Sequence, residues 1–331
     1  MIEIHRNDRK NVFLPHSNES LVNNRYRKDT KLGEGTYGEV CKAVDILSNT
    51  FVALKKVKAD QEEEGVPSTA LREIAILRDI SHPNIVKFVT KFIYIKKRKM
   101  SLANYCCRLL DVYNSEKHLY LIFEYCNTDL HKFLKNNPQD LSIDFIRHAS
   151  YQMLDALAFM HSHRILHRDI KPSNVLLSGD VVKLADFGLA RSISIPIKRY
   201  TVEVVTMWYR PPELIQKYNV YGSGIDIWGM GAVIAEMILH EPIFRGDSDI
   251  DQLHKIFDIL GTPKPSEYPD LDYFTDKKVF DYFPKNRIEI LTKLKTIGGD
   301  GYNLLMKMFE YNPGKRISAR EAMKDPFFIK H

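Results

Sequence analysis

Residues His167–Asn174, which read H-R-D-I-K-P-S-N, place a carboxylate, an ammonium and an amide in one short stretch, and D-F-G follows at Asp186. These side chains suit phosphoryl transfer, which needs a base that orients a hydroxyl, oxygen ligands for magnesium and positive charge on the phosphate. Asp169 can act as the base, Asn174 and Asp186 as metal ligands, and Lys171 as a partner of the γ-phosphate. The alternative is a polar loop beside the strand D-V-V-K-L-A-D. Both motifs in this order, with a glycine-rich loop upstream, favour phosphoryl transfer.

The glycine-rich loop reads K-L-G-E-G-T-Y-G-E-V over residues 31–40. Its alternating apolar residues predict a strand–turn–strand, and glycine lets the backbone approach phosphates closely. G-x-G-x-x-G alone fits a hairpin or a dinucleotide site equally well. Here V-A-L-K follows at Val52–Lys55, and no helix comes directly after the glycines as in a Rossmann fold. The pattern therefore favours a phosphate-binding hairpin followed by a lysine.

Together these motifs resemble those of eukaryotic protein kinases, and specifically of cyclin-dependent kinases, from about Tyr26 to Phe328. The resemblance implies an α+β bilobal protein kinase fold over residues 26–328. A small β-rich lobe with one major helix would span about 26–126, and a large, mainly helical lobe about 127–328. Residues 1–25 are expected to form a flexible N-terminal extension. The implied activity is transfer of the γ-phosphate of ATP to Ser or Thr followed by Pro, dependent on Mg²⁺ and a cyclin.

The resemblance also assigns roles in the nucleotide site. Lys55 would hold the α- and β-phosphates, and Glu73 on a helix would orient Lys55. Thr206 would link Lys171 to Asp169, completing the catalytic group. Residues expected to contact ATP come from the loop, two strands and the hinge: Leu32, Gly33, Glu34, Gly35, Thr36, Tyr37, Gly38, Val40, Ala53, Lys55, Phe123 (the gatekeeper), Glu124, Cys126 and Asp129.

Regulatory roles follow from the same resemblance. P-S-T-A-L-R-E is close to the P-S-T-A-I-R-E signature, so the helix around Pro67–Glu73 is expected to bind a cyclin. Thr201 stands where these kinases carry an activating phosphothreonine added by another kinase. Phosphate on Thr36 or Tyr37 would repel the phosphates of the nucleotide and inhibit the enzyme. Two further sets are implied: Arg72, Arg168 and Arg191 around the Thr201 phosphate, and Val205 and Arg210 around a substrate proline.

Composition limits the partners and the compartment. The net charge of +6 comes entirely from Lys87–Cys107, which holds six basic residues and no acid. The global charge therefore gives no reason to expect nucleic-acid binding. No apolar run is long enough to span a membrane, and the N-terminus lacks the apolar core of a signal peptide. The four cysteines show neither metal-ligand nor secretory spacing, so we expect the nucleus and the cytoplasm.

The same stretch, Lys87–Cys107, interrupts the family pattern between S-H-P-N-I-V and R-L-L-D-V-Y. It could be a basic arm for nucleic acid or an acidic partner, a loop without consequence, or translated non-coding sequence. The last is favoured because Val86 and Arg108 rejoin the pattern without a gap. In each case the stretch is expected to lie outside the catalytic core.

Three rival functions stay open. A kinase-shaped interaction protein without turnover is kept open by the insertion. A mitogen-activated kinase is disfavoured, because that class favours a T-x-Y switch and the order here is Tyr200-Thr201. A transcription-associated cyclin-dependent kinase is disfavoured because P-S-T-A-L-R-E leans toward cell-cycle control.

The remaining predictions concern structural residues. One helix before the catalytic loop should bury one apolar face: Ile146, Ala149, Met153, Ala156, Leu157 and Met160. His148, His161 and His163 are expected to be ordinary helix-surface or helix-end residues. The helix containing D-I-W-G-M-G should anchor the catalytic loop, and Arg316 should pair with Glu213.

Overall fold

The computed structural model describes residues 21–35, 38–57, 76, 82–85, 87–88, 108–115, 118–187, 190–192, 207–216, 221–264 and 287–329. The chain forms two compact units. We call them the small unit, residues 1–128 with 176–188, and the large unit, residues 129–175 with 189–331.

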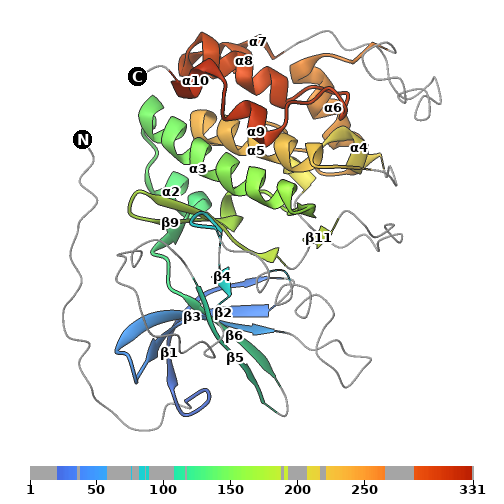
Figure 1. Ribbon diagram of the computed structural model, residues 1–331. Helices are drawn as coiled ribbons and strands as arrows, with labels where there is room; N and C mark the ends of the chain where they lie inside the picture. Colours follow the sequence, from blue (N-terminus) through green and yellow to red (C-terminus); the bar gives the residue numbers. More distant parts are fainter. Residues whose placement is uncertain are drawn as a thin grey trace. The chain divides into compact units, whose positions relative to one another are not determined.

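The small unit is built on a six-stranded sheet of order β1-β2-β3-β6-β5-β4 (Figure 1). Its strands are β1 Tyr26–Gly35, β2 Gly38–Asp45, β3 Thr50–Val57, β4 Lys87–Phe88, β5 Arg108–Asn114 and β6 Leu119–Glu124. The predicted strand–turn–strand is therefore confirmed as β1 and β2. One face of the sheet is a core that contains Ala43, Val52, Leu54 and Ile122, because alternate residues of a strand point to the same side.

Gly38 is required by this sheet. Its φ is +146°, and a Cβ built on it would lie 2.0 Å from the carbonyl oxygen of Lys56 on β3. No side chain fits at that distance, so only glycine lets β2 begin so close to its neighbour.

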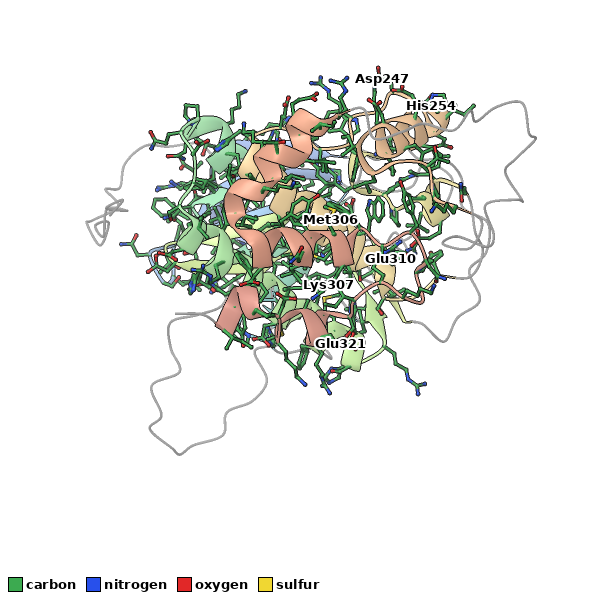
Figure 2. The ribbon with its side chains drawn as sticks, turned by 90° about the horizontal axis from the view of Figure 1, so that it is seen from above. Asp247, His254, Met306, Lys307, Glu310 and Glu321 are labelled. Atoms are coloured by element: carbon green, nitrogen blue, oxygen red, sulfur yellow. The ribbon has the colours of Figure 1, made fainter. Side chains whose placement is uncertain are left out.

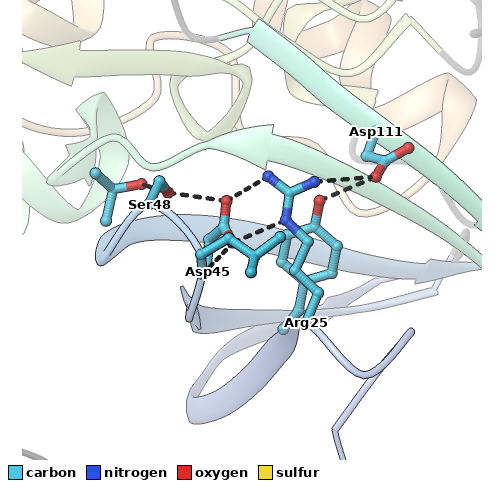
Figure 3. Close-up of polar contacts among 7 residues, drawn as sticks. Arg25, Asp45, Ser48 and Asp111 are labelled. Carbon is cyan, nitrogen blue, oxygen red and sulfur yellow. Dashed lines mark hydrogen bonds and ion pairs between the residues drawn. The ribbon is translucent and has the colours of Figure 1, made fainter. Parts of the chain in front are cut away.

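A polar cluster fixes the start of β1 to three other segments (Figure 3). Arg25 donates from Nε and Nη2 to the two carboxylate oxygens of Asp45, at 2.8 and 2.6 Å. Its Nη1 lies 3.7 Å from Asp111 on β5, and the Tyr26 hydroxyl donates to the same carboxylate at 3.0 Å. Ser48 donates to Asp45 at 2.8 Å. We call Arg25, Tyr26, Asp45, Ser48 and Asp111 the Arg25 cluster.

The structure differs from two expected boundaries. Val22 belongs to the hydrophobic core and Arg25 to the Arg25 cluster, so the folded part begins before Tyr26. Lys87 and Phe88, expected to lie outside the core, form β4, which pairs in parallel with Arg108 and Leu109. An edge strand presents unpaired N–H and C=O groups, which a parallel segment can satisfy.

The large unit is mainly helical. Its helices are α2 Leu130–Asn136, α3 Ile143–Ser162, α4 Pro212–Ile215, α5 Gly224–Leu239, α6 Asp249–Leu260, α7 Ile288–Leu294, α8 Gly299–Met308, α9 Ala319–Ala322 and α10 Pro326–Ile329. Short 3₁₀ turns span Pro172–Asn174, Met207–Tyr209 and Lys295–Ile297. Serine side chains accept a backbone hydrogen bond at the first turns of α3, α6 and α9: Ser142, Ser248 and Ser318.

Helix α5 forms the centre of the large unit. Every residue from Ile225 to Leu239 is buried. Trp228 packs on Phe244 and Phe309, with ring centroids 5.7 and 5.2 Å apart. The six predicted core residues of α3 are all buried as well, which confirms its apolar face. A helix buried on all sides gives a rigid support for the loops that contact it.

Helix α8 is tied to the end of the chain. Figure 2 labels Met306 and Lys307 on α8 and Glu321 on α9. The Lys307 Nζ lies 2.7 Å from the buried carboxylate of Asp325, which precedes α10. This ion pair joins the last two helices to α8.

The remaining strands are short. They are β7 Thr128–Asp129, β8 Ile165–Leu166, β9 Val175–Ser178, β10 Val181–Leu184 and β11 Arg191–Ser192. Strands β10, β9 and β7 form one sheet in that order, and β8 pairs antiparallel with β11. Strand β10 also joins the small unit, because Leu184 N donates to Asn84 O at 2.9 Å and Asn84 Nδ2 donates to Val182 O at 2.8 Å. No helix in the described part of the chain is long and apolar enough to cross a membrane.

Candidate active site

The catalytic loop begins at His167, directly after β8, and rests on the first turn of α5. Asp226 accepts hydrogen bonds from the backbone N–H groups of His167 at 2.9 Å and Arg168 at 2.8 Å. Its Oδ2 also lies 2.9 Å from Nε2 of His161. Burial alone would raise the pKa of Asp226, but the hydrogen bond and charge of His161, the charge of His167 and the backbone donors outweigh it and lower the pKa. The D-I-W-G-M-G helix therefore anchors the loop as predicted.

His161 has a role that sequence reasoning missed. It lies in the last turn of α3, with 12% of its side chain exposed, and contacts Asp226. The prediction of an ordinary helix-end residue was right about its place but wrong about its environment. Its signal in the sequence was weak, because nothing local shows which residue 65 positions away will face it.

Two residues of the loop donate to one carboxylate, that of Asp169. Lys171 Nζ lies 2.7 Å from Asp169 Oδ2. Asn174 Nδ2 donates to the same oxygen at 2.9 Å and to the backbone carbonyl of Asp169 at 2.8 Å. Asp169 is only 9% exposed, so its carboxylate is held in one place by two donors. Asp169, Lys171 and Asn174, which were predicted to act together, therefore lie side by side.

The other half of the predicted chemistry lies in the small unit. Lys55 on β3 is 9% exposed, and its Nζ lies 3.1 Å from Asp186 Oδ1. Asp186 has a φ of +65°, in the left-handed region that non-glycine residues seldom adopt. Such backbone persists where its surroundings hold it, and it is common at functional sites. Asp186 follows β10, whose contacts with Asn84 hold it to the small unit. Asn84 is a buried positioning residue that the sequence analysis did not single out.

Asn174 in the large unit and Asp186 in the small unit both have side-chain oxygens of the kind that magnesium prefers. Magnesium prefers oxygen ligands and binds through one or two carboxylates together with the phosphates of a substrate. Because the amide nitrogen of Asn174 is used by Asp169, its side-chain oxygen is the atom left to face a metal. Asp186 contributes a carboxylate. Among the described residues, no group of three or more His, Cys, Asp or Glu could hold a metal by itself. Each of the two residues by itself offers an oxygen of the kind that such a metal would need.

The small unit's sheet brings together most of the residues predicted to contact ATP. Leu32, Gly33, Glu34 and Gly35 lie on β1, Gly38 and Val40 on β2, Ala53 and Lys55 on β3, and Phe123 and Glu124 on β6, with Cys126 two residues after β6. Antiparallel register sets Val40 opposite Lys55 and Ala53 opposite Phe123. Asp129 in the large unit is the N-cap of α2, accepting from Lys132 N at 2.8 Å.

A pocket in the large unit opens beside the base. Its lining residues come from the catalytic loop, the Met207–Tyr209 turn with the residues after it, and α5: Arg168, Asp169, Ile170, Tyr209, Arg210, Pro211, Leu214, Ile225, Asp226 and Gly229. Asp169 and Arg210 therefore share one pocket, although 41 positions separate them. A Cβ on Gly229 would lie 3.1 Å from Ile170 Cβ, so glycine allows the loop to approach α5.

Tyr209, a half-buried residue of the pocket lining, contacts the buried Glu236. The Tyr209 hydroxyl donates to Glu236 Oε2 at 2.7 Å. Burial raises the pKa of Glu236 to about 7, although the hydrogen bond from Tyr209 opposes the shift. Burial likewise raises the pKa of Tyr209. The neighbouring turn is held by two further contacts, from Trp208 Nε1 to Gly246 O at 3.0 Å and from Gln252 Nε2 to Trp208 O at 3.3 Å.

The contact between Glu213 and Arg316 confirms the predicted structural pair. Arg316 donates to both oxygens of Glu213, at 2.6 and 3.1 Å, and both side chains are buried.

Of Arg191, the structure describes only the backbone, in β11. Several predicted residues lie outside the described part of the chain: Thr36, Tyr37, the segment Pro67–Glu73 with Arg72, Thr201, Val205 and Thr206.

Comparison with known families agrees with this geometry. Residues 26–328 match the family model described as a protein kinase domain, with an antiparallel sheet in one unit and a helical second unit. The match covers the small unit's sheet, the catalytic loop and the helices described above, except for Ile329, the last residue of α10.

Proposed function

Because this chain belongs to the protein kinase family, we propose that it is a cyclin-dependent serine/threonine kinase acting on Ser-Pro and Thr-Pro sites. Its fold is the bilobal α+β fold of that family, and its activity is phosphoryl transfer to proteins. The observation that supports the substrate class is the shared pocket of Asp169 and Arg210. A substrate residue beside the base and the residue after it would both contact this pocket.

Different residues of the chain have different roles in the proposed reaction. ATP supplies the phosphoryl group, and magnesium neutralises charge on its oxygens. Asp169, fixed by Lys171 and Asn174, orients the substrate hydroxyl and accepts its proton. Lys171 stands beside the base, where its charge can stabilise the transferred phosphate. Lys55 binds the α- and β-phosphates, and Asn174 and Asp186 provide oxygen ligands.

Substrate choice is tested with paired peptides. The full-length chain, a cell-cycle cyclin, ATP and Mg²⁺ are incubated with a Ser-Pro peptide or its Ser-Ala partner. We expect a much higher kcat/KM for Ser-Pro. Asp169→Asn should lower kcat by roughly 10²- to 10⁴-fold, because general-base catalysis contributes that much. Equal rates on the two peptides would refute proline direction, and a lack of any transfer would favour the interaction protein without turnover.

Regulation follows the same proposal. Cyclin binds the helix around Pro67–Glu73, whose Glu73 orients Lys55. Another kinase phosphorylates Thr201, and the phosphate gathers Arg72, Arg168 and Arg191. Phosphate on Thr36 or Tyr37 inhibits, and Val205 completes the proline pocket. We place this kinase in cell-cycle control in the nucleus and cytoplasm. A pull-down that recovers only transcription-associated cyclins would reassign it.

A further inference from the structure

Tyr221 lies just before α5 and contacts an arginine of the catalytic loop. The guanidinium carbon of Arg168 is 5.6 Å from the centroid of the Tyr221 ring. A guanidinium within about 6 Å of a ring centroid is attracted to the electrons of the ring face. Both side chains are half-buried, so water screens this attraction only in part.

The same short stretch also holds the backbone of Arg168. Asp226, five positions after Tyr221, accepts a hydrogen bond from Arg168 N at 2.8 Å. Arg168 has a φ of +71°, a conformation that a non-glycine residue keeps only where its surroundings hold it. Residues 221–226 therefore fix Arg168 at two points, its amide and its guanidinium. The buried helix α5 makes this support rigid.

We propose that Tyr221 is a positioning residue for Arg168, which holds the guanidinium ready to bind the phosphate on Thr201. This inference rests on the proposed function, in which Arg168 is one of the three phosphate-binding arginines. A free arginine side chain loses several rotamers when it binds a phosphate, and a ring that restricts it beforehand lowers that cost. The Tyr221 ring, rather than its hydroxyl, carries the effect.

The test compares the full-length chain with threonine or phosphothreonine incorporated at position 201. Each form is prepared as wild type, Tyr221→Leu and Tyr221→Phe, and its unfolding constant is measured with urea. The ratio of the two constants gives the stabilisation by phosphate. We expect Tyr221→Leu to reduce this ratio by about 2- to 30-fold, which corresponds to the range for such contacts. Tyr221→Phe keeps the ring and should keep the ratio.

The possible outcomes distinguish the role of Tyr221 from the proposed switch at Thr201. A general loss of stability in Tyr221→Leu affects both forms alike and cancels in the ratio. An unchanged ratio in Tyr221→Leu, with a clear phosphate effect in the wild type, would overturn the role of Tyr221 alone. A loss in Tyr221→Phe as large as in Tyr221→Leu would overturn the role of the ring. A wild-type chain that gains nothing from phosphate would overturn both this inference and the proposed switch at Thr201.

Discussion

Asp45 in the small unit and Glu236 in the large unit are buried to the same extent, with 3% of each residue exposed. Their pKa values nevertheless move in opposite directions. The hydrogen bond from Arg25 lowers the pKa of Asp45 to about 2, against the effect of burial and with help from Ser48 and the N–H of Leu47. Burial raises the pKa of Glu236 to about 7, because the hydrogen bond from the neutral hydroxyl of Tyr209 opposes this effect only in part.

The difference shows that a charged partner can outweigh the effect of burial on the pKa of a carboxylate, whereas a neutral hydroxyl does not. Asp45 stays ionised over the whole physiological range and acts as a permanent link between strands. Glu236 changes its charge near neutral pH, one hydrogen bond away from the pocket that Tyr209 lines. Among the described residues, no cation forms an ion pair with Glu236.

Removing the guanidinium of Arg25 is expected to have the largest effect on stability. Arg25→Met should lower the free energy of unfolding by about 3–5 kcal/mol at pH 7, because Asp45 would be left charged, buried and unpaired. Urea unfolding measures the change. Arg27→Met is the matched control, since Arg27 is also a half-buried arginine near the start of the sheet but forms no described ion pair. Equal losses in the two variants would show that the Arg25 cluster contributes no special stability.

Glu236 should have the next largest effect, which is a dependence of the free energy of unfolding on pH. Folding raises its pKa above the ordinary 4.5, so the native state binds more protons than the unfolded state between about pH 4.5 and 7. The free energy of unfolding should therefore fall by about 3 kcal/mol as the pH rises through this window. Urea unfolding at several pH values should show this slope in the wild type and lose it in Glu236→Gln. A slope that survives the substitution assigns it to another group.

Asp45 should cause a smaller change of the free energy of unfolding with pH, and this change has the opposite sign. Folding lowers its pKa, so the unfolded state binds more protons between about pH 4 and pH 2, and stability falls as the pH falls. The loss is about 2 kcal/mol. Asp45→Asn should be less stable at pH 7 but should lose less on acidification. Parallel pH profiles of variant and wild type would contradict the pairing with Arg25.

The smallest effect is expected from deleting Lys87–Cys107 and joining Val86 to Arg108. Parallel pairing sets Lys87 beside Arg108 and Phe88 beside Leu109, so both ends of the stretch run in the same direction one strand apart. Neighbouring strands are about 4.8 Å apart, so Arg108, which takes the place of Lys87 in the shortened chain, lies about one strand spacing from it. The melting temperature and cyclin-dependent activity should be nearly unchanged.

A second reason to expect that the deletion is tolerated is that β5 has contacts other than those with β4. It pairs with β6 from Leu109 to Asn114, and Tyr26 and Arg25 contact Asp111. Combining the deletion with Arg25→Met should therefore cost more than the two changes taken separately. Unfolding of the deletion protein alone would show that the stretch is structural. Transcript sequencing would show whether a chain without it is made.

Local patterns in the sequence were enough to predict much of the fold and half of the site. Alternating apolar residues located β1 and β2, and helical spacing gave the buried face of α3. The grouping of Asp169, Lys171 and Asn174 could be predicted because these residues are neighbours in one motif, so a single loop conformation brings them together.

Contacts between distant positions could not be predicted in the same way. The partner of Arg25 depends on the register of β1 and β2, and the partner of Tyr209 depends on how a 3₁₀ turn sits over α5. A one-residue change of register would exchange the faces of a strand, and no single segment encodes it. The first edge of the predicted insertion was wrong for the same reason, because Lys87 pairs only after the chain returns at Arg108.

The attachment of the catalytic loop to Asp226 has a consequence for its rate of amide hydrogen exchange. Loop amides normally exchange through small local openings, whereas core amides exchange only when the whole structure unfolds. The amides of His167 and Arg168 donate to a carboxylate on a helix that is itself buried. Their protons can exchange only when these hydrogen bonds break, so we expect the two loop amides to exchange more slowly than loop amides that face water.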